Sequence, residues 1–167
     1  MAPGRPRRKS PGKSGASRSC VLLLAVAAVL AIPAAAATER LVVDWHTGLA
    51  LYGYDPVAYF TDAKPLMGRP DVEYSLGGAV WRFRNEGNRQ AFIAHSDIYM
   101  PRYGGYDPIA VARGVAKPGH PDWWLLDNDR LYLFADARTR AAFIAKAADA
   151  IAAADEKWPA VRHALVP

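Results

Sequence analysis

The chain of 167 residues carries 21 lysines and arginines against 16 aspartates and glutamates, a formal net charge of +5, and a single cysteine. The first 37 residues hold six of the basic residues and no acidic one, so the remaining 130 residues hold 15 basic and 16 acidic residues, a net charge of −1. Those 130 residues therefore lack the basic composition of a nucleic-acid-binding protein. Because Cys20 lies among the first 37 residues, they also contain no cysteine for disulfides, zinc–thiolate sites or redox chemistry.

The N-terminal segment, residues 1–37, has the pattern of a secretory signal peptide. Its basic stretch precedes an apolar run from Cys20 to Ile32 and four alanines at 34–37 that suit a signal peptidase. The apolar run is short for a membrane span. We therefore expect a periplasmic or secreted protein without a stable membrane span after cleavage, and an uncleaved N-terminal anchor is the alternative. The general secretory route and, because of Arg7 and Arg8, the twin-arginine route both stay open.

The rest of the chain carries one series of short motifs twice, in residues 53–94 and 105–145. Two copies are too few for a solenoid. We therefore predict one domain over residues 38–159 made of two tandem pseudo-symmetric half-domains, with residues 160–167 as a tail and any shared site where the halves meet. The matched pairs are Gly53-Tyr54-Asp55-Pro56 with Gly105-Tyr106-Asp107-Pro108, Lys64-Pro65 with Lys117-Pro118, Trp81 and Phe83 with Tyr132 and Phe134, and Arg89 with Arg140.

The first copy follows an extended arm predicted at Leu41 to Trp45. Asp55 and Pro56 then predict the start of a short helix over 57–60, because the carboxylate caps free amide groups and proline has no amide proton to lose. The elements predicted after it are strands at 74–76 and 79–83 joined by Gly77 and Gly78, with Trp81 and Phe83 facing the core, and a helix at 86–94 capped by Asn85.

The second copy repeats this order. Asp107 and Pro108 predict a helix over 109–112, which Gly114 ends in a left-handed conformation. The elements predicted after it are strands at 123–126 and 130–134 joined by a turn at 127–129, and one amphipathic helix from Asp136 to Trp158 that Pro159 ends.

Together these elements predict an α+β fold. Its two hairpins are expected to form one small, four-stranded antiparallel sheet, with the helices packed on one face.

Four stretches of the chain resemble exported YHS domain-containing (seleno)proteins. They are Leu51 to Phe60, Trp81 to Phe92, Tyr99 to Tyr106 and Ala154 to Pro159. The resemblance covers nearly all of the chain after the leader. It implies a small α+β domain, often exported, with a poorly defined biochemical role and a wider superfamily associated with metal binding.

The chain departs from that family where chemistry is expected. Metal-associated relatives tend to carry cysteine at the positions that hold Ala58, Arg84 and Asn88 here, and redox-capable members carry cysteine or selenocysteine where this chain has Asp107. The resemblance therefore implies the fold and argues against a thiol-based metal-chaperone or peroxidase role.

The paired acidic turns are the main candidate site. Asp55 and Asp107, with their neighbouring tyrosines, could meet between the repeats and bind a cation or a small polar ligand; the alternative is that each aspartate only caps a helix. The aromatic residues around them, Tyr52 included, would suit a planar ligand such as a quinone or haem, or would fill the core. The ligand-binding candidates are Tyr54, Asp55, Tyr59, Tyr103, Tyr106 and Asp107, and the weak metal candidates are Asp55, Asp107 and His120.

Three functions follow as hypotheses. The first is an exported binding or accessory domain of the cell envelope that binds a metal ion or small ligand between its repeats, or an envelope protein. The second is an enzyme with tyrosine and aspartate acid–base chemistry in the same cleft, although no nucleophile motif, phosphate loop or dinucleotide fingerprint assigns a catalytic residue. The third is a purely structural or protein-interaction domain.

Overall fold

The computed structural model describes Met1, Gly4 and residues 40–165. The predicted signal peptide, residues 1–37, lies outside the described residues apart from Met1 and Gly4. Residues 40–165 all belong to one compact unit of the chain.

Two segments of this unit contain the same elements in the same order. The first contains η2 (Leu51–Gly53), α1 (Ala58–Thr61), β1 (Arg69–Leu76), β2 (Ala79–Phe83) and α2 (Glu86–Ala94). The second contains η3 (Arg102–Gly105), α4 (Pro108–Val111), β3 (His120–Asp127), β4 (Arg130–Phe134) and α5 (Ala137–Ala145). Helix α3 (Ser96–Tyr99) connects the segments, and α6 (Ala147–Ala164) follows the second.

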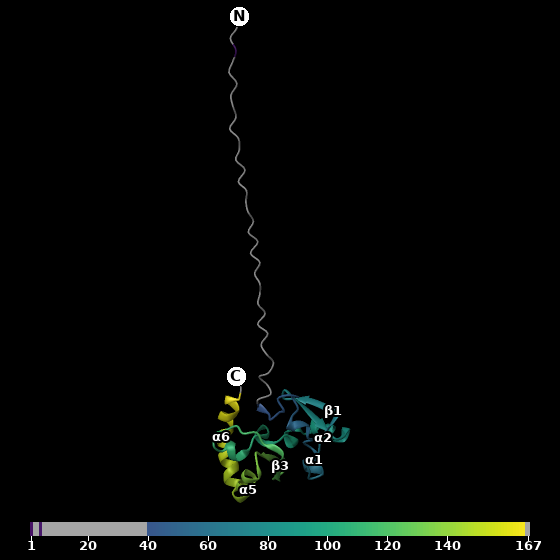
Figure 1. The fold of residues 1–167 in the computed structure, drawn as a ribbon, viewed down its shortest axis with the longest axis vertical. Coiled ribbons are helices and arrows are strands. Elements are labelled where there is room, and N and C mark those ends of the chain that lie inside the picture. Colours follow the sequence, from purple (N-terminus) through teal and green to yellow (C-terminus); the bar gives the residue numbers. More distant parts are fainter. Residues whose placement is uncertain (2–3, 5–39, 166–167) are drawn as a thin grey trace. The chain divides into compact units, whose positions relative to one another are not determined.

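The α+β class is confirmed, but the single four-stranded sheet is wrong. Within residues 40–165, β1 pairs only with β2 and β3 only with β4, each as an antiparallel two-stranded sheet. The outer edge of β2 is already occupied, because Ala50 N donates to Val80 O at 2.9 Å and Val80 N to Gly48 O at 3.2 Å. In Figure 1 the blue-to-teal and green-to-yellow segments form neighbouring groups, and β3 reaches the first through η2 and the ring of Tyr59. A pseudo-twofold relation between the segments stays a prediction.

The two hairpins share their irregularities. Each first strand slips register near its start, between Arg69 and Glu73 in β1 and between His120 and Trp124 in β3. Each turn has two residues with positive φ, at 66° and 82° for Gly77 and Gly78 and at 47° and 54° for Asn128 and Asp129. Such turns match the twist of the strands, so the second turn is two residues long and not the three predicted.

Each segment closes its own hydrophobic core around one phenylalanine. Phe92 of α2 packs on Trp81 and Phe83 at ring-centroid distances of 4.9 and 5.2 Å. Phe143 of α5 packs on Tyr132 and Phe134 at the same distances, 4.9 and 5.2 Å. All six rings are at most 3% exposed, so the predicted core positions of the second strands are confirmed.

The N-terminal arm joins the two cores. Leu41 belongs to the first core and its neighbour Val42 to the second. The backbone of Val42 bonds both segments, because its N–H donates to Gly104 O at 2.7 Å and its carbonyl accepts from Leu51 N at 3.3 Å. The predicted arm therefore connects the two segments. Within it, Val43 forms an isolated β-bridge with Ala50.

The start of α2 and the end of the turn after α4 lie where the capping residues place them. Helix α2 has the predicted bounds, and the Asn85 side chain accepts from Asn88 N. Gly114, at φ 77°, ends the turn after α4 with two backbone bonds, Gly114 N to Val111 O and Val115 N to Ala110 O. These are the two bonds of a Schellman motif.

The long predicted helix from Asp136 to Trp158 is wrong in two respects. The chain breaks at Lys146 (φ −149°, ψ 53°) into α5 and α6, so Ile144 is 52% exposed and lies off the buried stripe. Helix α6 also continues through Pro159 to Ala164. The turn beyond the proline contains the buried Val161, whose carbonyl accepts a hydrogen bond from Leu165 N at 3.2 Å.

One pair of sequence matches is also wrong. Asp55 N donates to Leu66 O at 2.8 Å, and Asp107 N donates to Lys117 O at 2.9 Å. Lys117 therefore corresponds to Leu66 and not to Lys64. The first loop is one residue longer, and the shared Lys-Pro letters fall at different places along it.

No helix within residues 40–165 has both the length and the apolar character needed to span a bilayer.

Candidate functional site

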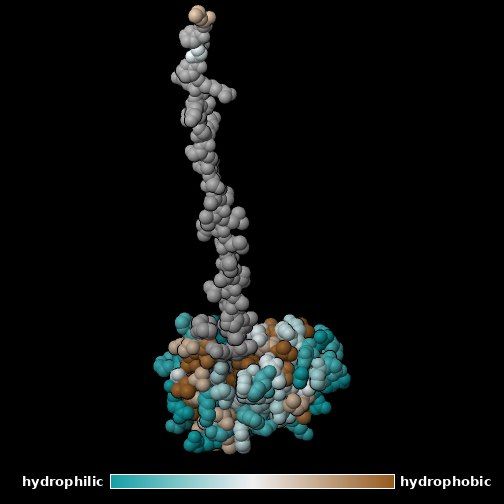
Figure 2. Space-filling model, turned by 45° about the horizontal axis from the view of Figure 1, so that its top comes forward, coloured by the Kyte–Doolittle hydropathy of each residue, from teal (hydrophilic) through white to brown (hydrophobic). Residues whose placement is uncertain are grey.

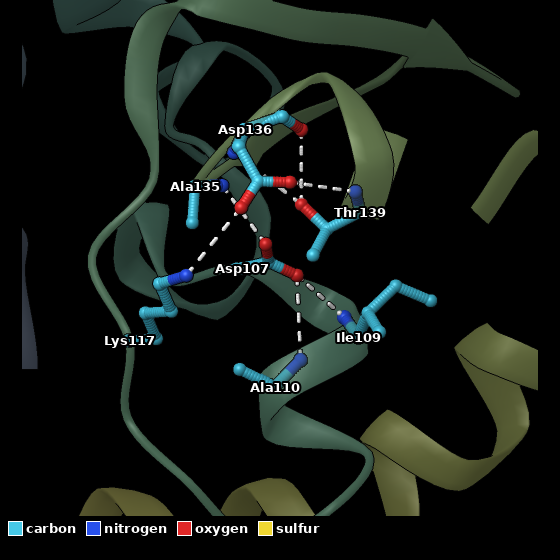
Figure 3. Close-up of polar contacts among 7 residues, drawn as sticks. All are labelled: Asp107, Ile109, Ala110, Lys117, Ala135, Asp136 and Thr139. Carbon is cyan, nitrogen blue, oxygen red and sulfur yellow. Dashed lines mark hydrogen bonds and ion pairs between the residues drawn. The ribbon is translucent and has the colours of Figure 1, made fainter. Parts of the chain in front are cut away.

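The carboxylate of Asp107 is buried and fully used by its own segment (Figure 3). Its Oδ1 accepts from Ile109 N at 2.8 Å and from Ala110 N at 3.3 Å, which caps α4. Its Oδ2 accepts from Ala135 N at 2.8 Å, just after β4. One side chain thus ties the start of a helix to the end of a hairpin.

Asp55 makes corresponding bonds in the first segment, but it bonds the turn before α1, and α1 itself has no side-chain cap. Its Oδ1 accepts from Val57 N at 2.8 Å, and its Oδ2 accepts from Arg84 N at 2.8 Å, just after β2. A third bond, from Asn88 Nδ2 at 2.6 Å, adds α2 to the connection. Both carboxylates are 0% exposed.

These bonds favour a structural role of the paired aspartates over ligand binding, with Asp107 as the helix cap and Asp55 as the acceptor for the turn before α1. A carboxylate that is buried and already accepts three protein hydrogen bonds has little capacity left for a cation or a substrate proton. Each aspartate is bonded within its own segment, and ligand binding by the pair stays a prediction. The acid–base enzyme alternative loses its most specific residues.

The four candidate tyrosines separate between the two cores. Tyr54 packs against the first core and Tyr59 lies within it, whereas Tyr103 and Tyr106 belong to the second. Both second-core rings contact Trp158 of α6, at centroid distances of 5.7 and 6.2 Å. These tyrosines therefore fill cores and do not line one shared pocket.

Tyr59 is the candidate that connects the segments. Its buried hydroxyl donates to Pro121 O at 3.1 Å, and its ring meets Trp124 edge-on at 5.3 Å. Burial, followed by the nearby Tyr54, Asp122 and Asp55, raises the pKa of Tyr59 far above that of a free phenol. The phenol therefore supports β3 as a neutral hydrogen-bond donor.

Raising the pH above about 10 is expected to destabilise the protein through Tyr59. The unfolded phenol releases its proton there while the folded one keeps it, so stability is complete below that pH and falls by up to about 1.4 kcal/mol per pH unit above it. Burial and the hydrogen bond to Asp155 also raise the pKa of Tyr103, which adds to the fall. Urea unfolding from pH 8 to 11 measures it. The slope should be shallower in Tyr59→Phe, and an unchanged slope would contradict this assignment.

His120, the weak metal candidate, lies at the start of β3. Its Nδ1 is 3.6 Å from Asp122 Oδ2, with both side chains more than half exposed, and its ring lies 6.2 Å from that of Tyr52. In the part of the chain that the structure describes, no three His, Cys, Asp or Glu side chains are grouped to hold a metal ion. His120 therefore has one acidic neighbour where a metal site needs more ligands.

A groove of about 500 Å³ runs along β3. Its apolar part includes Trp123, which is 40% exposed. Its volume lies within the range of about 300–1,000 Å³ that is typical of pockets for drug-sized ligands, and most of its lining residues are apolar. Its lining residues are Ala63, Asp122, Trp123, Trp124, Leu125, Leu126 and Arg140.

The groove lies where the two segments meet. Ala63 comes from the loop after α1, and the other lining residues come from β3 and α5 of the second segment. Tyr59 of the first segment holds Trp124 and Pro121, and Arg140 Nε donates to Trp124 O at 2.7 Å. The floor of the groove is therefore held in place from both sides.

A second hollow, of about 460 Å³, is lined by Leu66, Met67, Arg69 and Arg84. Arg69 already forms an ion pair with Asp71 at 2.5 Å, and the hollow has no aromatic wall. It offers a ligand less apolar area than the β3 groove.

Apolar side chains also reach the surface elsewhere. Figure 2 shows separate hydrophobic (brown) patches among hydrophilic (teal) ones on one face. Large exposed hydrophobic residues besides Trp123 include Trp45 at 82%, Val115 at 55%, Met67 at 54% and Ile144 at 52%.

Sequence analysis missed the residues of the groove. Trp123 and Trp124 correspond to Val72 and Glu73 of the first copy, so they are not among the residues that the two copies share. The available signal was the difference: a tryptophan pair in one copy only.

No family model, no curated protein and no solved structure matches the chain. The candidate function therefore depends on the residues of the groove itself.

Proposed function

We propose that this chain is an exported, YHS-like accessory domain of the cell envelope that binds a small apolar ligand in the groove along β3. The observation that carries the proposal is the cavity of about 500 Å³ with Trp123 and Trp124 in its wall, formed where the two segments meet. Buried aromatic anchors supply much of the binding energy in such sites. The YHS assignment is supported by the motif stretches, and export to the periplasm or medium by the leader pattern.

Binding needs no catalytic group in the groove. Its lining contains one carboxylate, Asp122, whose neighbour is His120, and no nucleophilic side chain. The groove therefore suits a carrier or sensor of a small molecule better than an enzyme.

Replacing Trp123 by alanine is expected to weaken binding of N-phenyl-1-naphthylamine, an uncharged flat dye, about tenfold. The indole is partly exposed, so its loss removes ligand contact while the cores stay intact. A titration followed by dye fluorescence measures the affinity. Trp45→Ala is the matched control, because Trp45 is exposed and lies outside the groove lining. Equal affinity of wild type and Trp123→Ala, or no binding by wild type, would contradict the proposal.

A further inference from the structure

The two copies of one arginine differ in how their charge is neutralised. Arg89 and Arg140 hold the same position, the fourth residue of α2 and of α5. Each donates to the carbonyl of the residue after the register slip, Arg89 Nη1 to Glu73 O at 3.5 Å and Arg140 Nε to Trp124 O at 2.7 Å.

Arg89 is paired with an acid within its own helix. Its Nη2 lies 2.6 Å from Glu86 Oε1, one turn earlier on α2. The corresponding residue of α5 is Ala137. Among residues 40–165 no carboxylate lies within ion-pair distance of Arg140, and both of its terminal nitrogens remain without a protein acceptor.

Arg140 is also the basic side chain in the wall of the groove. The acid of the groove lining, Asp122, comes two residues before Trp124, and its Oδ2 lies 3.6 Å from His120 Nδ1. A guanidinium with two free terminal nitrogens presents a planar fork that matches a carboxylate or sulfonate, and it also stacks on aromatic surfaces. Trp123 and Trp124 line the same groove, and indole rings supply apolar contact surface.

We infer that the groove takes a flat apolar molecule bearing one anionic group, with the anion on Arg140 and the apolar body on Trp123 and Trp124. The inference rests on the proposed function, because it names the ligand class of the same groove. The inference depends on a difference between the copies. Arg89 has a counter-ion in its own helix, Glu86, whereas Arg140 lines an apolar cavity in which a bound ligand would supply the counter-ion.

Two dyes test the inference, since 1-anilinonaphthalene-8-sulfonate is N-phenyl-1-naphthylamine with one added sulfonate. Wild-type protein is expected to bind the sulfonate at least about tenfold more tightly than the neutral dye. Arg140→Gln should remove that preference, so that this variant binds the two dyes with similar affinity.

Two further variants use the duplication as a control. Ala137→Glu restores at α5 the acid that pairs with Arg89 in α2, and is expected to reduce sulfonate binding without changing any groove residue. Arg89→Gln removes the equivalent charge from the other copy and should leave both affinities unchanged. Circular dichroism confirms that each variant is folded before titration.

The outcomes separate the two proposals. If the neutral dye binds and depends on Trp123, but Arg140→Gln and Ala137→Glu do not reduce sulfonate binding selectively, the anion inference is wrong and the groove remains a binding site. If wild-type protein binds neither dye, both the proposed function and the anion inference are overturned.

Discussion

Replacing Asp107 by alanine is expected to lower the free energy of unfolding by about 3–5 kcal/mol. The substitution leaves three amide groups, of Ile109, Ala110 and Ala135, without the acceptor that satisfies them. Hydrogen bonds to charged groups are worth about 1.5–3 kcal/mol each and are only partly additive, which sets this range. Urea unfolding followed by circular dichroism measures the change.

Two companion variants show whether the carboxylate itself is required. Asp107→Asn keeps one acceptor oxygen and replaces the other with an NH2 group. That group would face either the amides at the start of α4 or Ala135 N, from which it cannot accept a hydrogen bond, so we expect an intermediate loss of unfolding free energy. Asp136→Ala, at the next N-cap along the chain, removes an exposed carboxylate and should cost clearly less (Figure 3). A loss for Asp107→Ala no larger than for Asp136→Ala would mean that this carboxylate does not hold the fold together.

Replacing Gly119 by alanine is expected to cost about 2–4 kcal/mol. A Cβ atom at Gly119 would lie 2.6 Å from Leu133 Cβ and 2.7 Å from Gly105 O, both too close for any side chain. The backbone cannot move aside, because Gly119 N donates to that same Gly105 O at 2.9 Å. The thermal midpoint and the urea midpoint should both fall.

Two other glycines, Gly68 and Gly114, provide a second test of this effect and a control for it. Gly68→Ala places its Cβ 2.5 Å from the backbone carbon of Arg82 and should be similarly costly. Gly114 has no atom within 4 Å of an added Cβ, so Gly114→Ala costs only the strain of its φ of 77°, about 1 kcal/mol. If Gly119→Ala lowers the free energy of unfolding no more than Gly114→Ala does, the close packing of residue 119 on β4 is not the reason that this position requires glycine.

Local signals predicted the elements that depend on local chemistry. Asn85 caps α2, and Gly77 and Gly78 form a tight turn with positive φ, so the first hairpin and its helix could be located from neighbouring residues alone. The alternation of Trp81 and Phe83 likewise placed both rings in the core.

Elements that depend on distant contacts could not be predicted in this way. The alanine-rich stretch around Lys146 contains no breaker, and only packing of α5 and α6 on the second core separates them there. Whether two hairpins join edge to edge depends on what else reaches those edges, and Gly48 and Ala50, in the stretch just before η2, bond to β2.

The candidate site shows the limit of arguing from a repeat. Letters that both copies share, such as Asp55 and Asp107, mark what each half needs in order to fold. The proposed ligand site depends instead on differences between the copies, namely Trp123, Trp124 and Ala137, which stands where the first copy has Glu86. Shared residues predicted the scaffold, and the differences identify the proposed binding site.

Leu41 belongs to one core and Val42 to the other, so loss of the N-terminal arm would weaken both cores at once. If the leader is removed after residue 37, the mature chain begins only three residues ahead of Leu41. Exoproteolytic trimming by a handful of residues would then withdraw one side chain from each core in a single event. In a chain cleaved at that position, a uniform amino terminus would be a condition for the stability of the whole domain, and ragged ends would produce a weakened subpopulation.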